Sequence, residues 1–153
     1  MVPVINALMP KFDFAVASKD WHPRQTVHFD KWPPHCIRAT VGARFHPQLQ
    51  TGGLQLIALK GTGDTDDGYS AFEATNVDLE SALRMQAVEE VYVCGLTTEY
   101  CVQATARDAL GFGFQVSVIT DATAAVNAQA GDHEKALENM QQSGIQLLQS
   151  AEI

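Results

Sequence analysis

The 153-residue sequence has few cysteines and no long apolar run. Its three cysteines are an odd number without Cys-x-x-Cys spacing, which argues against a disulfide framework and against a thiolate zinc site. No apolar run approaches membrane-spanning length, and the amino terminus lacks the basic start and long apolar stretch of a signal peptide. We therefore expect a soluble, cytoplasmic protein with reduced thiols and no membrane partner.

Positive charge is also scarce. Ten basic residues stand against eighteen acidic ones, a net charge of −8, and the acids are spread along the chain. A nucleic-acid partner is therefore not expected, because binding to phosphate backbones needs clustered lysine and arginine. With 46% hydrophobic residues, the chain has enough apolar material for one domain that covers residues 1–153.

The order of apolar segments predicts an α/β fold. Strands are expected at residues 14–18, 54–59, 91–94 and 114–119, and helices at 77–88, 100–110 and 132–143. Strands that alternate with helices imply three α/β/α layers around a mainly parallel sheet. Ligands bind beyond the carboxyl ends of such strands. Polar groups do follow the first three strands, whereas Thr120 and Asp121, after the fourth, have the composition of an ordinary loop.

Cys101 follows the third strand and a Gly-Leu-Thr-Thr turn, in the expected first turn of the next helix. Free N–H groups and the positive end of the helix dipole favour a thiolate there, and the same N–H groups can hold an oxyanion. Cys101 is therefore a candidate nucleophile. Free cysteines are also among the most buried residues, so an inert core thiol is the alternative.

A group of histidines follows the first strand. Asp20 and His22 are two residues apart and point to the same side if the strand geometry persists, and a proline-rich loop can bring His28 or His35 to them. Imidazole with one carboxylate suits zinc, iron or manganese in an open site. Surface histidines that only form hydrogen bonds are the alternative.

Lys60 closes the apolar second strand. Beside Cys101 it would lower the pKa of the thiol or stabilise a developing negative charge; the alternative is a surface lysine with a buried stem.

His46 and His133 have no potential ligands near them in the sequence, and we expect both to be structural or surface residues.

Several motifs together indicate a family. They are Asp20-Trp-His-Pro with the following His28, Trp-Pro-Pro-His at residues 32–35, Lys-Gly-Thr at 60–62, Asp67-Gly-Tyr-Ser-Ala-Phe72, and Gly95-Leu-Thr-Thr-Glu-Tyr-Cys101-Val. In order and spacing they closely resemble the nicotinamidase/pyrazinamidase branch of the isochorismatase-like cysteine hydrolases. The resemblance covers nearly the whole chain.

This resemblance implies hydrolysis of nicotinamide to nicotinate and ammonia through a thioester on Cys101, with Lys60 as the charged partner. The backbone N–H groups of Thr97 and Cys101 would form the oxyanion hole, and the peptide between Leu96 and Thr97 would be cis. One divalent metal ion would anchor the pyridine nitrogen. Its implied ligands are Asp20, His22, His28 and His35. Trp32 would pack against the substrate ring, and Leu96 and Tyr100 would line the pocket.

The chain departs from the family pattern at its start. Family members begin with a central strand that ends in Asp-x-Gln-x-Asp-Phe, whose first aspartate accepts the cysteine proton. Here Met1 begins a segment that matches the following helix, and Asp13 lies at the remote end of the next strand. We therefore expect a sheet without its first strand, impaired turnover, and unpaired edges that favour a homo-oligomer. The alternatives are an inactive metal- or ligand-binding homologue and a related isochorismatase-type hydrolase of small amides.

Overall fold

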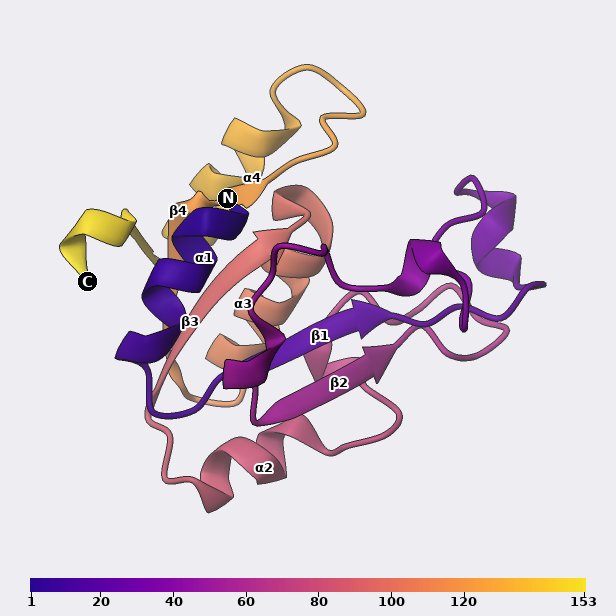
Figure 1. The fold of residues 1–153 in the computed structure, drawn as a ribbon. Helices are drawn as coiled ribbons and strands as arrows, with labels where there is room; N and C mark the ends of the chain where they lie inside the picture. The colour runs from indigo at the N-terminus through magenta and orange to yellow at the C-terminus, as the bar shows by residue number, and fades with distance from the viewer.

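The computed structural model describes residues 1–153 as an α/β structure with parallel strands (Figure 1). The helices are α1 (Val2–Leu8), α2 (Leu79–Met85), α3 (Gln103–Gly111) and α4 (Asp132–Gln142). The strands are β1 (Val16–Asp20), β2 (Leu56–Lys60), β3 (Glu90–Leu96), β4 (Gln115–Ala124) and β5 (Gln146–Leu148). The predicted alternation is confirmed. Among the strands, only β5 escaped the sequence pattern, because three residues are too few to show a period.

The strands form two separate parallel sheets. One contains β1 and β2, and the other has the order β3-β4-β5. The expected mainly parallel sheet is therefore present in two pieces, and β1 and β3 each pair along one edge only. In Figure 1 the β1-β2 pair lies beside the larger sheet, which carries most of the helices.

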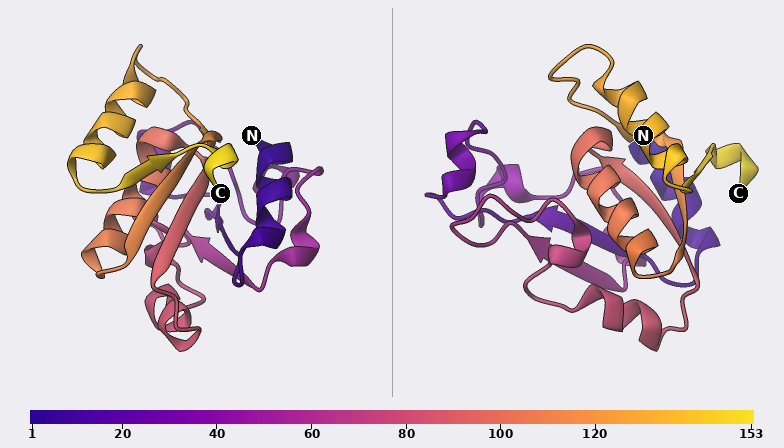
Figure 2. Two further views of the ribbon diagram at one scale, coloured as in Figure 1. Left: turned by 90° about the vertical axis from the view of Figure 1, so that its left-hand side faces the viewer. Right: turned by 180° about the vertical axis from the view of Figure 1, so that it is seen from behind.

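Helices cover both faces of the larger sheet. Figure 2 shows β3 and β4 between α1 on one side and α3 and α4 on the other. Leu8 of α1 packs on Ile119 and Ala122 of β4, and all three side chains are buried. On the opposite face, Ala106 and Ala109 of α3 are fully buried in the main core. The three predicted layers are thus confirmed, with small residues allowing α3 to approach the sheet closely.

The prediction of a loop at Thr120 and Asp121 is wrong. β4 continues to Ala124, because a register shift in β3 lets Gly95 pair with Thr123 beyond that point. The backbone N–H of Ser150 donates to a carboxylate oxygen of Asp121 at 2.8 Å, which ties the end of the chain to this strand.

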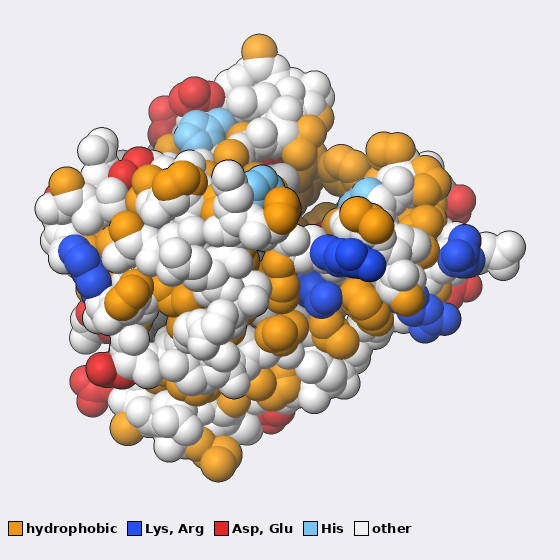
Figure 3. Space-filling model, viewed as in Figure 1, with side chains coloured by type: hydrophobic (Ala, Val, Ile, Leu, Met, Phe, Trp, Pro, Cys, Tyr) orange, Lys and Arg blue, Asp and Glu red, His pale blue; other side chains and the backbone are white.

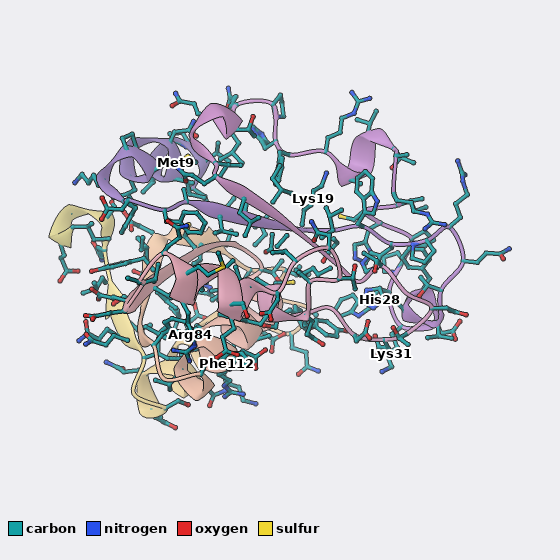
Figure 4. The ribbon with its side chains drawn as sticks, turned by 90° about the horizontal axis from the view of Figure 1, so that it is seen from below. Met9, Lys19, His28, Lys31, Arg84 and Phe112 are labelled. Carbon is teal, nitrogen blue, oxygen red and sulfur yellow. The ribbon has the colours of Figure 1, made fainter.

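The carboxyl ends of the strands position the polar residues. Asp20 and Lys60 are the last residues of β1 and β2 and are direct partners in the parallel register. Figure 4 shows Met9 at one end of the molecule and His28 and Lys31 at the other, among the loops that follow β1 and β2.

None of the helices combines the length and the apolar character needed to span a bilayer.

Candidate active site

Lys60 is the centre of a cluster at the ends of β1 and β2. Its ammonium donates to the Cys101 sulfur at 3.2 Å and to the Gly68 carbonyl at 2.8 Å, and it forms an ion pair with Asp20. Lys60 is only 2% exposed, so the alternative of a surface lysine is wrong. The structure thus brings Lys60 and Cys101 together, as a catalytic pair requires.

The backbone around Cys101 differs in one respect from the expected first helical turn. Residues Thr98–Val102 form a π-helical turn, and α3 begins only at Gln103. The N–H of Val102 reaches back to the Thr97 carbonyl at 3.1 Å, which is the wide i to i−5 spacing of a π turn. The peptide between Leu96 and Thr97 is cis, as the resemblance implies. A backbone hydrogen bond from Thr97 acts to lower the pKa of the Cys101 thiol.

Burial acts against the thiolate that the free N–H groups and the helix dipole are expected to favour at Cys101. Burial raises the pKa of the Cys101 thiol, and the opposing effect of the Lys60 charge does not cancel this increase. Burial would also lower the pKa of Lys60, but the charges of Cys101 and Asp20 outweigh it and raise that pKa. Asp20 thus helps to hold the Lys60 ammonium in its charged form beside the Cys101 sulfur.

Three of the four predicted metal ligands lie together. His22, His28 and His35 each offer a ring nitrogen within 4.8 Å of the other two. Asp20 is outside this cluster, because its carboxylate is bound to Lys60. Figure 3 shows one face of the molecule, on which a hollow opens between groups of hydrophobic side chains.

The three imidazoles are oriented for a common ligand. Each Nδ1 lies near an acceptor: the Gly61 carbonyl at 2.8 Å from His22, an Asp66 oxygen at 3.0 Å from His28, and the Pro33 carbonyl at 2.8 Å from His35. Proton donation from Nδ1 leaves Nε2 as the lone-pair nitrogen. The Nε2 of His22 is buried and has no partner. These residues fit a divalent ion, because an unpartnered buried imidazole nitrogen is costly unless something binds it.

Backbone contacts bring these distant segments together. His22 forms an isolated bridge with Ile37, which places His35 beside it. Gly61 has a φ of +60°, and a Cβ there would lie 2.5 Å from Cε1 of His22. Only glycine lets the loop after β2 approach the His22 ring this closely. The sequence motif contained Gly61, but its spacing alone did not reveal this function.

Aromatic side chains form a wall beside the histidines. Trp32 and Tyr100 are in edge contact, with ring centroids 4.9 Å apart at 88°. The Trp32 ring also stacks at 6.3 Å from that of His28. Leu96 closes β3 and is 59% exposed. Of the three predicted substrate residues, Leu96 thus ends a strand, and Trp32 and Tyr100 lie in segments that follow strands and touch each other.

Sequence reasoning did not single out Asp66, and it included Tyr69 only as a member of the motif Asp67-Gly-Tyr-Ser-Ala-Phe72, without a role of its own. Asp66 pairs with Lys31, and the Tyr69 hydroxyl donates to Asp66 at 3.2 Å. The hydrogen bond from Lys31, helped by those from His28 and Tyr69, holds the pKa of Asp66 below its usual range. The available signal for Asp66 was the acid-rich run at residues 64–67, in the loop after β2. His46, by contrast, is exposed, as expected for a surface histidine.

A model of the isochorismatase domain matches residues 2–152. The chain belongs to the isochorismatase family. This family member is 37% identical to the nicotinamidase/pyrazinamidase of Mycobacterium tuberculosis, and the match covers 92% of the chain and 78% of that relative.

Solved structures agree with the assignment to the isochorismatase family. The pyrazinamidase of Pyrococcus horikoshii in complex with zinc is 38% identical with a TM-score of 0.85, and the match covers 97% of this chain and 84% of that one. PnC1 of L. infantum in complex with nicotinate is 33% identical with a TM-score of 0.90, over 98% of this chain and 79% of that one.

Proposed function

We propose that this isochorismatase-family chain is a nicotinamidase-type amidohydrolase that converts nicotinamide to nicotinate and ammonia. The contact between Cys101 and Lys60, next to the three-histidine cluster, is the observation that carries the proposal. Relatives named nicotinamidase or pyrazinamidase, and a neighbour in complex with nicotinate, support this choice of substrate.

Cys101 acts as the nucleophile. Its sulfur forms a bond to the amide carbonyl carbon, and the carbonyl oxygen becomes an oxyanion held by the N–H groups of Thr97 and Cys101. The C–N bond then breaks, the nitrogen takes up the proton that the Cys101 thiol gave up and leaves as ammonia, and a nicotinoyl thioester remains. Water cleaves the thioester to nicotinate and restores the thiol. Lys60 stabilises the anionic sulfur at 3.2 Å.

The metal is assigned to the three histidines. His22, His28 and His35 would hold one divalent ion, and Asp20 would join them if its carboxylate also reached the site. When bound, the ion supplies a Lewis-acidic anchor for the pyridine nitrogen. We propose zinc, since three imidazoles and an open position suit it and a pyrazinamidase neighbour contains it; iron and manganese are the alternatives.

Metal analysis of the purified protein tests this assignment. We expect about one equivalent of metal in the wild type and none in His22→Ala, because the Nε2 of His22 is the buried nitrogen without a partner. His46→Ala is the matched control, since that histidine is exposed and is not a member of the cluster. Equal occupancy in all three proteins would contradict the three-histidine site.

The substrate ring would lie against Trp32, with Tyr100 and Leu96 lining the pocket. Trp32 and Tyr100 present aromatic surface next to His28, and an electron-poor pyridine ring stacks well on an indole. The exposed side chain of Leu96 offers apolar contact at the end of β3.

A second candidate is a metal- and ligand-binding homologue without turnover. One observation favours it: no carboxylate contacts the Cys101 sulfur directly, and Asp20 reaches it only through Lys60. This is also the reason to expect slow hydrolysis.

Two further predictions concern assembly and location. β1 and β3 each pair along one edge only, which favours a homo-oligomer, and three free thiols favour a cytoplasmic location.

Two assays separate these candidates. Nicotinaldehyde, whose carbonyl adds to a thiol without a general base, should bind the wild type and not Cys101→Ala. Ammonia release from nicotinamide should be slow but above that of Cys101→Ala. Binding without turnover supports the second candidate, and nicotinaldehyde binding that is the same in both proteins contradicts the assignment of Cys101 as the nucleophile.

A further inference from the structure

Asp66 lies in the loop after β2 and contacts three side chains that converge on the histidine cluster. One carboxylate oxygen lies 3.0 Å from Nδ1 of His28, and the hydroxyl of Tyr69 donates to that same oxygen at 3.2 Å. The other oxygen pairs with Lys31. Figure 4 shows His28 and Lys31 at the same end of the molecule.

The first contact determines the orientation of the His28 ring. His28 is 4% exposed, and donation from Nδ1 to a carboxylate leaves Nε2 as the nitrogen available to a metal. The same bond raises the basicity of the imidazole as a ligand. His22 and His35 are held by backbone carbonyls instead, so His28 is the ligand whose support a side-chain substitution can remove.

The second contact connects the same oxygen to the aromatic wall. The indole N–H of Trp32 donates to the Tyr69 hydroxyl at 3.0 Å, and that hydroxyl donates to Asp66. A continuous hydrogen-bond chain therefore runs from Trp32 through Tyr69 and Asp66 to His28. Each of the two hydrogen bonds to Tyr69 also needs the hydroxyl, because a phenyl ring offers neither a donor nor an acceptor.

We propose that Asp66 is a positioning residue that holds the metal ligand His28 and, through Tyr69, the ring-stacking residue Trp32 in one fixed relation. This inference rests on the metal site and pocket proposed above. Because Asp66 holds His28 directly and Trp32 through Tyr69, the metal site and the indole ring stay at a constant separation. A heteroaromatic amide bound between them is then oriented toward Cys101 before the reaction.

Zinc affinity is the direct test, measured on purified full-length protein by competition with a chromogenic chelator. Asp66→Ala should bind zinc about 10- to 100-fold more weakly than the wild type, the range for loss of a carboxylate behind a histidine ligand. Asp67→Ala is the matched control, since Asp67 is the adjacent, exposed acid. It should leave the affinity unchanged.

Further measurements separate positioning from general stability. The metal-free form of Asp66→Ala should melt at the same temperature as that of Asp67→Ala. Tyr69→Phe should keep its zinc affinity within about threefold and bind nicotinaldehyde several-fold more weakly, because it breaks only the link to Trp32. If Asp66→Ala fails to fold, the zinc affinity of Asp66→Asn is the test instead. Asparagine keeps the shape of the side chain and one acceptor oxygen, so its zinc affinity should lie between those expected for Asp66→Ala and the wild type.

Wild-type zinc affinity in Asp66→Ala, or in Asp66→Asn where that variant decides, would overturn the inference and leave the proposed hydrolase intact. Unchanged nicotinaldehyde binding in Tyr69→Phe would overturn its second half. A wild-type protein that binds no zinc would contradict the metal site itself, and the inference with it.

Discussion

Replacing Lys60 by methionine removes the positive charge that lies 3.2 Å from the Cys101 sulfur and keeps a side chain of similar length. At an effective dielectric constant of about 20, two unit charges at this separation interact with about 5 kcal/mol. Asp20 is bound to the same ammonium, so we assign roughly half of this, about 2.5 kcal/mol, to the thiolate. The thiolate fraction then falls about 70-fold.

The expected change in reaction rate is smaller than the change in thiolate fraction. A more basic thiolate is also more nucleophilic, which recovers about half of the effect on a logarithmic scale. Iodoacetamide should therefore alkylate Cys101 about tenfold more slowly in Lys60→Met at a fixed pH. Because burial already raises the pKa of Cys101, the rate in the wild type should increase with pH up to an inflection above the ordinary cysteine value. The substitution should move that inflection further up.

Peptide mass spectrometry measures the rate at each cysteine separately. Cys94 is the internal reference, because burial alone raises its pKa to about 11 and Lys60 has no part in that increase. An equal or faster rate at Cys101 in the variant, with Cys94 unchanged, would refute the electrostatic role of Lys60. A faster rate at Cys94 would reveal loss of the buried structure instead.

Two further predictions concern stability, each measured by urea unfolding. Gly61→Ala should cost about 1–3 kcal/mol, because its Cβ would lie 2.5 Å from the His22 ring at a φ of +60°, whereas Gly52→Ala, with no atom near its Cβ, should stay within about 0.5 kcal/mol. Met140→Ala should cost about 2–5 kcal/mol, because its side chain is fully buried, and Met85→Ala, which is 83% exposed, should change stability by less than about 0.5 kcal/mol. An equal loss within either pair would contradict the packing described.

The fold was predictable from the sequence because its signals are local. Apolar runs separated by helical periodicity defined every strand but β5, and the order of these segments defined parallel pairing. The extent of β4 through Asp121 was not predictable in this way. It depends on pairing with Gly95 beyond a register shift, which is a property of the neighbouring strand.

The candidate site was predictable where parallel strands bring residues to one edge. Asp20 and Lys60 end paired strands, so their contact follows from the register. The raised pKa of Cys101 depends on burial by distant segments, and the contact of Asp66 with His28 joins two loops 38 residues apart. Neither has a local signal.

The most direct test of Cys101 as an amide-cleaving nucleophile is mass spectrometry of the protein quenched in acid during incubation with nicotinamide. A nicotinoyl group should be found on the peptide that contains Cys101, and it should disappear as nicotinate accumulates. Formation of nicotinate by Cys101→Ala at the wild-type rate, or a nicotinoyl group on another residue of the wild type, would contradict this mechanism.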